Sequence, residues 1–286
     1  MIEMNNLKIT ANLSEKEKNE IMSVYHLCNA TDSEHYDFSF DDDARYYLYY
    51  NNNSIISVVS LIPYEEGYCL YGFVHPNFRR KHIMTNLIKF ITDELCNPNM
   101  LHSQNDHHPD APAPVSLIQV HIPDHKGNTT DELLIPKHIH TLLSNTGFSF
   151  SHHEYLMEFL FDNLSEIDDC IHSTYLSNSS VFPEPEFDEE ENEYSLWLGE
   201  TYIGGCFIMP FYEDNYVTFY DFEIISEFRS KGFGRAGLSA ILHDLKNKRF
   251  EKLILHVSGE NKIAHNLYMS CGLTVHSSLS VYKKFI

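Results

Sequence analysis

The chain has 286 residues, 43% of them hydrophobic and 13% aromatic, which is enough for one large or two ordinary domains. Its formal net charge of −21 argues against general affinity for nucleic acid, because binding to phosphates needs a basic face. An acidic surface is compatible with cationic small-molecule partners. No apolar run is long enough to span a bilayer, and the N-terminus lacks the basic and apolar segments of a signal peptide. The six cysteines form no CxxC pair. We therefore expect a cytoplasmic protein with reduced thiols and no membrane partner.

The first half is predicted to begin with an amphipathic helix over residues 14–29, with Ser14 as its N-cap. A second helix follows the third strand, and a third helix ends near Leu143. Turn residues separate the strand-like runs, which are expected at residues 44–50, 54–62, 68–74 and 116–122 and in a run from Gly147 to Phe161.

Residues 97–114 are rich in Asn, His, Asp and Pro and are predicted to form an exposed loop. Five side chains there suggest a metal site, namely His102, Asp106, His107, His108 and Asp110. Zinc sites usually draw their ligands from fixed positions on ordered elements, so we predict no metal site.

The second half repeats this order of elements. A short helix is expected at residues 165–176, and the acidic segment 182–193 is expected to be a solvated linker or surface loop. A hairpin that turns at Gly199 comes next. The remaining elements are a strand over residues 216–225, a helix to Lys246, a strand at 253–257, a helix at 261–269 and a last strand at 278–285.

A basic, glycine-bearing loop joins the 216–225 strand to the helix that follows it. Its residues run Arg229-Ser230-Lys231-Gly232-Phe233-Gly234-Arg235. The first N–H groups of a helix have no partner within it, and the helix dipole places partial positive charge there. Glycines let the backbone approach a phosphate closely. The loop therefore predicts an anion site.

The two halves align as an internal repeat, which indicates two similar α/β units. Arg79 corresponds to Arg229 and Gly147 to Gly272, but the anion loop does not repeat. The first half carries different residues at four key positions: His82 for Gly232, Met84 for Gly234, Pro136 for Asn261 and Leu143 for Tyr268.

Two common phosphate motifs fit this loop poorly. Residues 232–237 match the glycine spacing of a dinucleotide fingerprint, but a charged segment separates strand from glycines and no acidic residue closes the next strand. A P-loop is excluded because no Gly-Lys-Ser or Gly-Lys-Thr follows.

The chain resembles the GNAT superfamily of N-acetyltransferases. Residues 229–234 match the family's (Gln/Arg)-x-x-Gly-x-(Gly/Ala) loop, and the downstream pattern is carried by Glu260, Asn261, Ala264, Leu267, Tyr268, Gly272 and Leu273. The resemblance implies an α/β (α+β) fold of two tandem GNAT-like domains, each a mixed, mostly antiparallel sheet flanked by helices. We place a degenerate domain at residues 1–163 and an acetyl-CoA-binding domain at 164–286.

The resemblance also implies roles for individual residues. Tyr268 would protonate the departing thiolate, and Asn261 would contact the cofactor arm. Backbone groups of the preceding strand would bind the pantetheine at Ile224 and Ile225. The pyrophosphate of coenzyme A would be held by backbone amides within Arg229, Ser230, Lys231, Gly232, Phe233, Gly234, Arg235 and Ala236.

Chemistry supports the role of Tyr268, since a phenol has a pKa of about 10 and a thiol about 8.5. The alternative for Tyr268 is a core tyrosine, because the chain has 18 tyrosines. Asp221 and Glu223 alternate along one strand and share a face unless a bulge intervenes, so either could act as the base. The alternative for both is an ordinary solvent-facing acid, and His256 is a third candidate base.

We interpret the chain as an N-acetyltransferase that transfers an acetyl group from acetyl-CoA to a primary amine of a small molecule or peptide by direct attack. It would act as a monomer or homodimer. Two alternatives stay open: a non-catalytic acyl-CoA-binding or regulatory protein of the same fold, and an interaction module. The sequence leaves the acceptor amine open, because the fold does not choose among acceptors.

Overall fold

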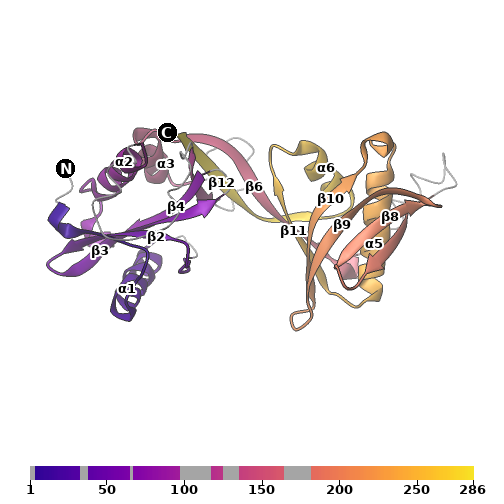
Figure 1. The fold of residues 1–286 in the computed structure, drawn as a ribbon, viewed down its shortest axis with the longest axis horizontal. Coiled ribbons are helices and arrows are strands. Elements are labelled where there is room, and N and C mark those ends of the chain that lie inside the picture. Colours follow the sequence, from indigo (N-terminus) through magenta and orange to yellow (C-terminus); the bar gives the residue numbers. More distant parts are fainter. Residues whose placement is uncertain (1–3, 33–37, 65–66, 97–116, 125–134, 164–181) are drawn as a thin grey trace. The chain divides into compact units, whose positions relative to one another are not determined.

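The computed structural model describes residues 4–32, 38–64, 67–96, 117–124, 135–163 and 182–286. The chain divides into two compact units (Figure 1). Unit 1 comprises Met1–Ser151 and Leu279–Ile286, and unit 2 comprises His152–Ser278. Mixed sheets flanked by helices form both units, as the sequence predicted.

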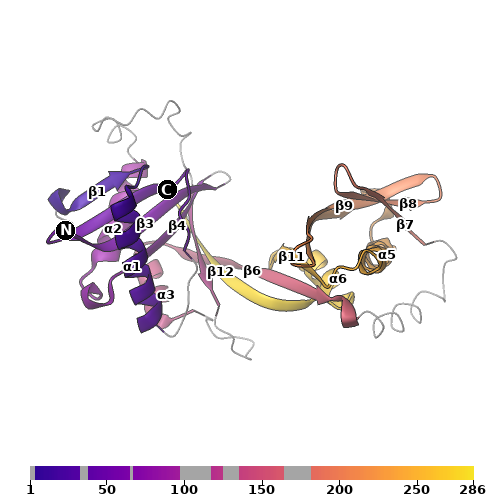
Figure 2. The same cartoon turned by 90° about the horizontal axis from the view of Figure 1, so that it is seen from below.

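Unit 1 is a sheet with helices on both faces. Helix α1 (Glu15–Thr31) covers one face, and α2 (Ile83–Cys96) and α3 (Lys137–Asn145) cover the other (Figures 1 and 2). The parallel pair is β4 with β5, and the other pairings are antiparallel. In sheet order the strands are β1 (Leu7–Thr10), β2 (Arg45–Asn51), β3 (Ser54–Tyr64), β4 (Gly67–Val74), β5 (Leu117–Pro123) and the end of β12 (Thr274–Phe285).

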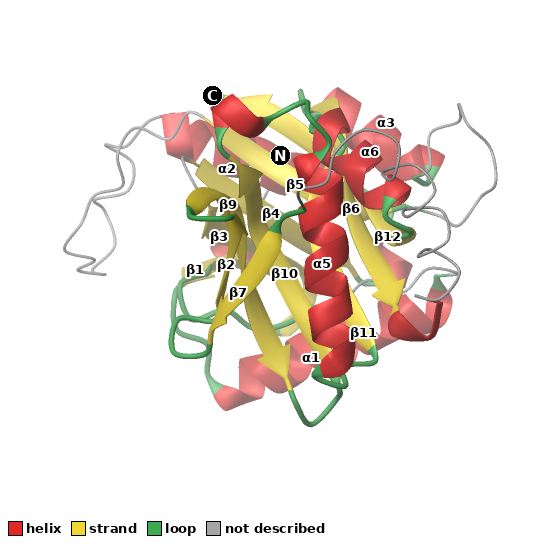
Figure 3. Cartoon of the chain, turned by 90° about the vertical axis from the view of Figure 1, so that its right-hand side faces the viewer, coloured by secondary structure: helices red, strands yellow, loops and turns green. Residues whose placement is uncertain are grey.

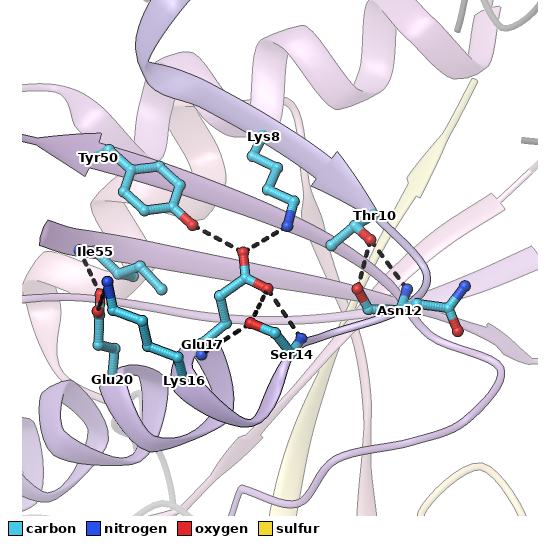
Figure 4. A network of polar contacts seen from close by, with 9 residues as sticks. All are labelled: Lys8, Thr10, Asn12, Ser14, Lys16, Glu17, Glu20, Tyr50 and Ile55. Carbon is cyan, nitrogen blue, oxygen red and sulfur yellow. Dashed lines mark hydrogen bonds and ion pairs between the residues drawn. The ribbon is translucent and has the colours of Figure 1, made fainter. Parts of the chain in front are cut away.

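The start of α1 shows how the sequence fixes an element of unit 1. Ser14 is the N-cap, as predicted, and it forms a capping box with Glu17 (Figure 4). The Glu17 carboxylate also accepts hydrogen bonds from Lys8 Nζ at 2.6 Å and from the Tyr50 hydroxyl at 3.1 Å. Burial alone would raise the pKa of Glu17, but these hydrogen bonds outweigh it and lower the pKa to about 2. The network ties α1 to β1 and β2.

The strands of unit 2 also pair in a mixed pattern, with β10 and β11 as the parallel pair. Helix α5 (Phe233–Asn247) lies along this sheet (Figure 3), and α6 (Lys262–Ser270) packs on β11. Aliphatic residues of α5 such as Leu238 and Leu242 are buried against the sheet. In sheet order the strands are β6 (Ser149–Leu160), β11 (Lys252–Ser258), β10 (Tyr216–Ile224), β9 (Thr201–Phe211), β8 (Glu193–Leu198) and β7 (Glu184–Asp188).

Each unit is completed by a strand from the other half of the sequence. Strand β6 pairs with β11 over seven residue pairs, and its Met157 and Phe159 enter the core of unit 2. The end of β12 pairs with β5 in unit 1, where Lys284 Nζ donates to Thr146 O at 2.8 Å. The two halves of the sequence are therefore not independent folding units.

Most of the predicted helices and strands are confirmed to within three residues at their ends. The expectation of a solvated loop over residues 182–193 is wrong, because Glu184–Asp188 forms strand β7 and pairs with β8. Its acidic residues alternate with half-buried Pro185 and Phe187, and this period-2 pattern is typical of a strand with one solvated face. The expected helix at residues 165–176 and the loop at residues 97–114 lie outside the described residues.

Within the described ranges, no helix combines the length and the apolar character needed to cross a membrane.

Candidate functional site

The parallel strands β10 and β11 separate part-way along their length. Their ladder consists of three pairs and ends with Thr218 opposite Ile254. Strand β10 continues to Ile224 and β11 to Ser258, so the backbone edges that face each other beyond this point are not paired in a ladder. Unpaired strand edges at the carboxyl end of a parallel pair are a common place for a ligand.

A β-bulge interrupts β10 beside this opening. Tyr220 pairs with Phe207 and Glu223 with Gly205 on β9, so one extra residue lies between them on β10. Asp221 takes up the extra length at a φ of 53°. Asp221 and Glu223 were expected to share a face only if no bulge intervened, and that condition is not met. The bulge leaves Phe222 packed against the core, while the two acids are exposed.

The glycine loop follows directly. A 3₁₀ turn, Ser226–Phe228, leads to Gly232, the N-cap of α5, at a φ of 87°. Ala236 N donates to Gly232 O at 3.1 Å as the first hydrogen bond of the helix, so the amides of Phe233, Gly234 and Arg235 precede the intrahelical ladder. A Cβ on Gly234 would lie 3.5 Å from Leu267 and 3.7 Å from Ile224. The loop is an open cradle of amides against the end of β10.

The charged side chains of the loop each contact a neighbouring residue and do not converge on one point. Arg229 Nε donates to Ile224 O at 2.5 Å, and its guanidinium lies 3.7 Å from the exposed Glu223 carboxylate. Lys231 lies over the Phe228 ring, and Arg235 Nε donates to the Ser270 hydroxyl at 3.0 Å. Ser230 has a φ of 59°, which helps the chain to turn into the helix. Residues 229–236, which the sequence assigned to the anion site, run from the 3₁₀ turn into the first turn of α5. Before them, Ile225 donates its N–H to Ile203 O at 2.9 Å.

Tyr268 on α6 reaches the point where the strands separate. Its ring is 7% exposed and packs edge-on against Phe219, the first residue of β10 beyond the ladder, at 6.4 Å. In the part of the chain that the structure describes, its hydroxyl has no hydrogen-bond partner. Burial raises the pKa of Tyr268 to about 12, with smaller contributions from Cys206 and Cys271. The phenol is therefore protonated at neutral pH and has a free donor.

Asn261 has a structural role as a helix cap that the sequence analysis did not identify. Its Oδ1 accepts from Ala264 N at 3.1 Å, which makes it the N-cap of α6. The side-chain NH₂ group remains the donor for any ligand. The third candidate base, His256, is exposed on β11.

Unit 1 repeats the local geometry but not the site. Arg79 Nε donates to Val74 O as Arg229 does to Ile224 O, and His82 has a φ of 59° where Gly232 has 87°. Pro136 is an N-cap like Asn261. The register of β3 with β4 is continuous, so β4 has no bulge. These parallels agree with the predicted internal repeat.

No described side chains form a group of three or more His, Cys, Asp or Glu residues that could hold a metal ion.

A family model for the acetyltransferase (GNAT) family matches residues 13–110 and 156–273. The chain belongs to the acetyltransferase (GNAT) family. The two matched regions fall on the two halves of the repeat, in agreement with a tandem member of the family.

Solved structures show the same fold at low sequence identity. A GCN5-related N-acetyltransferase from Sphaerobacter thermophilus has a TM-score of 0.61 at 12% identity, covering 100% of this chain and 97% of its own. A tandem GNAT protein from the clavulanic acid biosynthesis pathway, solved without AcCoA, has a TM-score of 0.54 at 8% identity, covering 98% of each chain. A glucosamine N-acetyltransferase region of a fungal multi-domain β-N-acetylglucosaminidase has a TM-score of 0.64 at 9% identity, covering 97% of this chain and 38% of that one. No curated protein matches the chain.

Sequence reasoning missed the close approach of α5 to β8. A Cβ on Gly237 would lie 2.5 Å from Leu196 Cδ1, so this glycine sets how near the helix lies to the sheet. The glycine spacing at residues 232–237 could have indicated it, since the third glycine of such a run serves helix–strand packing.

Proposed function

We propose that unit 2 is an acetyl-CoA-dependent N-acetyltransferase that acts on a primary amine of a small molecule or peptide by direct attack. The observation that carries this proposal is the opening between β10 and β11, which begins at Thr218 and lies beside the glycine loop and Tyr268. Membership in the acetyltransferase family supports acyl transfer in general.

The residues present fit coenzyme A. The amides before Ala236, with the positive φ of Gly232, form a cradle for a pyrophosphate at the N-terminus of a 15-residue helix. A Cβ at Gly234 would stand in ordinary contact with Ile224 and Leu267, so the absence of a side chain keeps the cradle open. Beyond the ladder, β10 offers backbone groups to an extended arm such as pantetheine. When bound, acetyl-CoA would supply the activated acetyl group.

Two kinds of side chain transfer the protons of the reaction, one as a general acid and one as a general base. The Tyr268 phenol, uncharged at neutral pH, donates a hydrogen bond or a proton to the departing sulfur. Asp221 or Glu223 takes the proton from the amine, directly or through a water, because both are exposed beside the opening. The ion pair of Glu223 with Arg229 is exposed and weak, so it does not remove Glu223 from this role.

The test is a thiol-release assay with acetyl-CoA across a panel of primary amines. We expect amine-dependent release of one thiol per acetylated amine. Saturable coenzyme A binding without release for any amine would favour the non-catalytic acyl-CoA-binding alternative. No saturable binding would contradict both and would support an interaction module.

The cytoplasmic location is part of the same proposal. Its support is that the five described cysteines are free thiols, as expected in a reducing compartment.

A further inference from the structure

Unit 1 contains a cavity of its own, in the opening between β4 and β5. Their parallel ladder ends with Cys69 opposite Gln119, and the strands separate beyond it. The cavity has a volume of about 710 Å³. This lies within the range of roughly 300–1,000 Å³ that is typical of small-molecule sites. Its walls come from α1, β4, β5, the start of α2 and α3.

The walls of this cavity are not those that would hold a nucleotide pyrophosphate. Strand β4 has no bulge, and His82 before α2 and Met84 in its first turn stand in place of two glycines. A Cβ on Gly72 would lie 3.0 Å from Met84 Cε, so the thioether lies against the strand beside the opening. Side chains therefore take the space that unit 2 keeps free for backbone amides.

The interior of the cavity is mostly apolar. On the side of α1, an aromatic cluster of Tyr25, Phe38 and Phe73 forms the wall, with the rings of Phe38 and Phe73 edge-to-face at 5.2 Å. On the other side, Ile139 and Leu142 of α3 close it. Transfer of an extended hydrocarbon chain from water to such a surface lowers its free energy.

The rim is cationic, although the chain carries a net charge of −21. Arg79, Arg80 and His82 follow β4, and His138 lies on α3, which follows β5 in the chain. Because β4 and β5 are parallel, these side chains come at the same edge of the sheet. Asp32 is the carboxylate among the described lining residues, and Arg79 already binds it with two hydrogen bonds of 2.5 and 2.8 Å.

We propose that unit 1 binds a carboxylate with an extended apolar chain, with the chain between the aromatic wall and α3 and the carboxylate at Arg80 and the two rim imidazoles. Pairing of Arg79 with Asp32 leaves one arginine, His82 and His138 at the rim, which suits a single negative charge. The N-terminus of α2, a 14-residue helix, adds partial positive charge on the same edge. This site is separate from the acetyl-transfer site, and its test needs no acetyl-CoA.

Titration calorimetry of the full chain tests the proposal with dodecanoate as the probe and dodecanol as its uncharged counterpart. We expect saturable binding of one dodecanoate. Arg80→Glu should weaken it about tenfold, because the substitution replaces a solvent-exposed attraction between the guanidinium and the dodecanoate carboxylate with repulsion between two carboxylates. Dodecanol binding should be equal in Arg80→Glu and the unchanged chain. Arg249→Glu is the matched control, since Arg249 is also exposed and has a φ of 70° against 61° for Arg80.

A second variant, Ile139→Trp, fills the interior and should abolish binding of both probes. Thermal melting verifies that it is folded, and Arg80→Glu keeps the test decisive if it is not. The proposal is overturned if dodecanoate shows no saturable binding, if folded Ile139→Trp binds it unchanged, if Arg80→Glu and Arg249→Glu behave alike, or if coenzyme A displaces it.

Discussion

Replacing Tyr268 by Phe is the sharpest test of the proposed chemistry. The substitution removes the hydroxyl and keeps the ring that packs against Phe219. Because the hydroxyl has no partner among the described residues, its loss leaves no buried group unpaired. The folded state should therefore lose less than about 1 kcal/mol of stability at neutral pH.

The expected loss of rate follows from the role of the phenol. General acids contribute about 10²- to 10⁴-fold to the rate, with each tenfold worth about 1.4 kcal/mol of activation free energy. A thiol has a pKa of about 8.5, so a thiolate is already a fair leaving group and the lower end of this range applies. We expect kcat to fall about 100-fold, while the Kd for coenzyme A changes by less than about threefold.

The assay combines thiol release for kcat with calorimetry for coenzyme A binding. Tyr216→Phe is the matched control: Tyr216 lies at the other end of β10, in the paired part of the ladder, stacked on Phe211 at 4.5 Å. It should keep full activity. Unchanged kcat in Tyr268→Phe would refute the role of the phenol, and an equal fall of kcat in both variants would point to general damage of β10.

The raised pKa of Tyr268 gives the same variant a second readout. Burial disfavours the phenolate in the folded state, so a phenol whose pKa is about 12 when folded and 10.0 otherwise lowers the free energy of unfolding as the pH rises from 10 to 12, and has no such effect below pH 10. This alkaline decline in the free energy of unfolding amounts to about 3 kcal/mol. Tyr268→Phe should therefore show a shallower alkaline decline in the free energy of unfolding than the unchanged chain.

Three further predictions follow from other parts of the fold. Gly232→Val forces a β-branched residue to a φ of 87° and should raise the Kd for coenzyme A about tenfold or more, measured by calorimetry. Glu17→Gln should lower the free energy of unfolding by about 2 kcal/mol at pH 7, after solvent screening, and should have no effect near pH 2. The reason is that the lowered pKa of Glu17 stabilises unit 1 above pH 4.5, and this contribution is lost as the pH falls towards 2. Denaturant unfolding measured across this pH range tests it. A fragment of residues 164–286 should lack cooperative thermal unfolding, because it loses Met157 and Phe159 from the core and leaves β11 without its partner β6.

Matched controls sharpen these three tests. Gly199→Val places the same strain at a φ of 59° in a turn where a Cβ meets nothing within 4 Å, so it should leave coenzyme A binding unchanged. Glu20→Gln alters a more exposed acid on the same helix and should show no comparable pH dependence. A fragment that begins at Ser149 retains β6 and should unfold more cooperatively; equal behaviour of the two fragments would contradict the importance of the strand.

Much of unit 2 could be predicted because its site depends on local sequence. Gly232 and Gly234 lie at a strand-to-helix junction, and the first amides of a helix need no distant partner to point outward. The same locality explains why Ser14 was identified as an N-cap, since its partner Glu17 is three residues away. Strand β7 was missed because the acidic run hides a half-buried alternation of Pro185 and Phe187.

Other features depend on partners distant in the sequence. The bulge at Asp221 exists only as a mismatch between β10 and β9, and the role of Gly237 depends on Leu196 of β8. The cavity of unit 1 depends on where the ladder of β4 and β5 ends, which neither strand specifies alone. Sequence comparison of the two halves identified the missing glycines there but gave no sign of the cavity.

The sequence by itself determined the family, the tandem repeat and the half of the chain that carries the glycine loop, because these depend on residue identities at short, fixed spacings. Only the tertiary structure decided that β6 completes unit 2 and that the end of β12 completes unit 1. Strand pairing depends on complementary backbone edges and on burial of one face of the sheet. The N–H and C=O groups along a backbone edge are the same whatever the side chains are. Backbone hydrogen bonds between strands therefore do not reveal from the sequence which strand pairs with which.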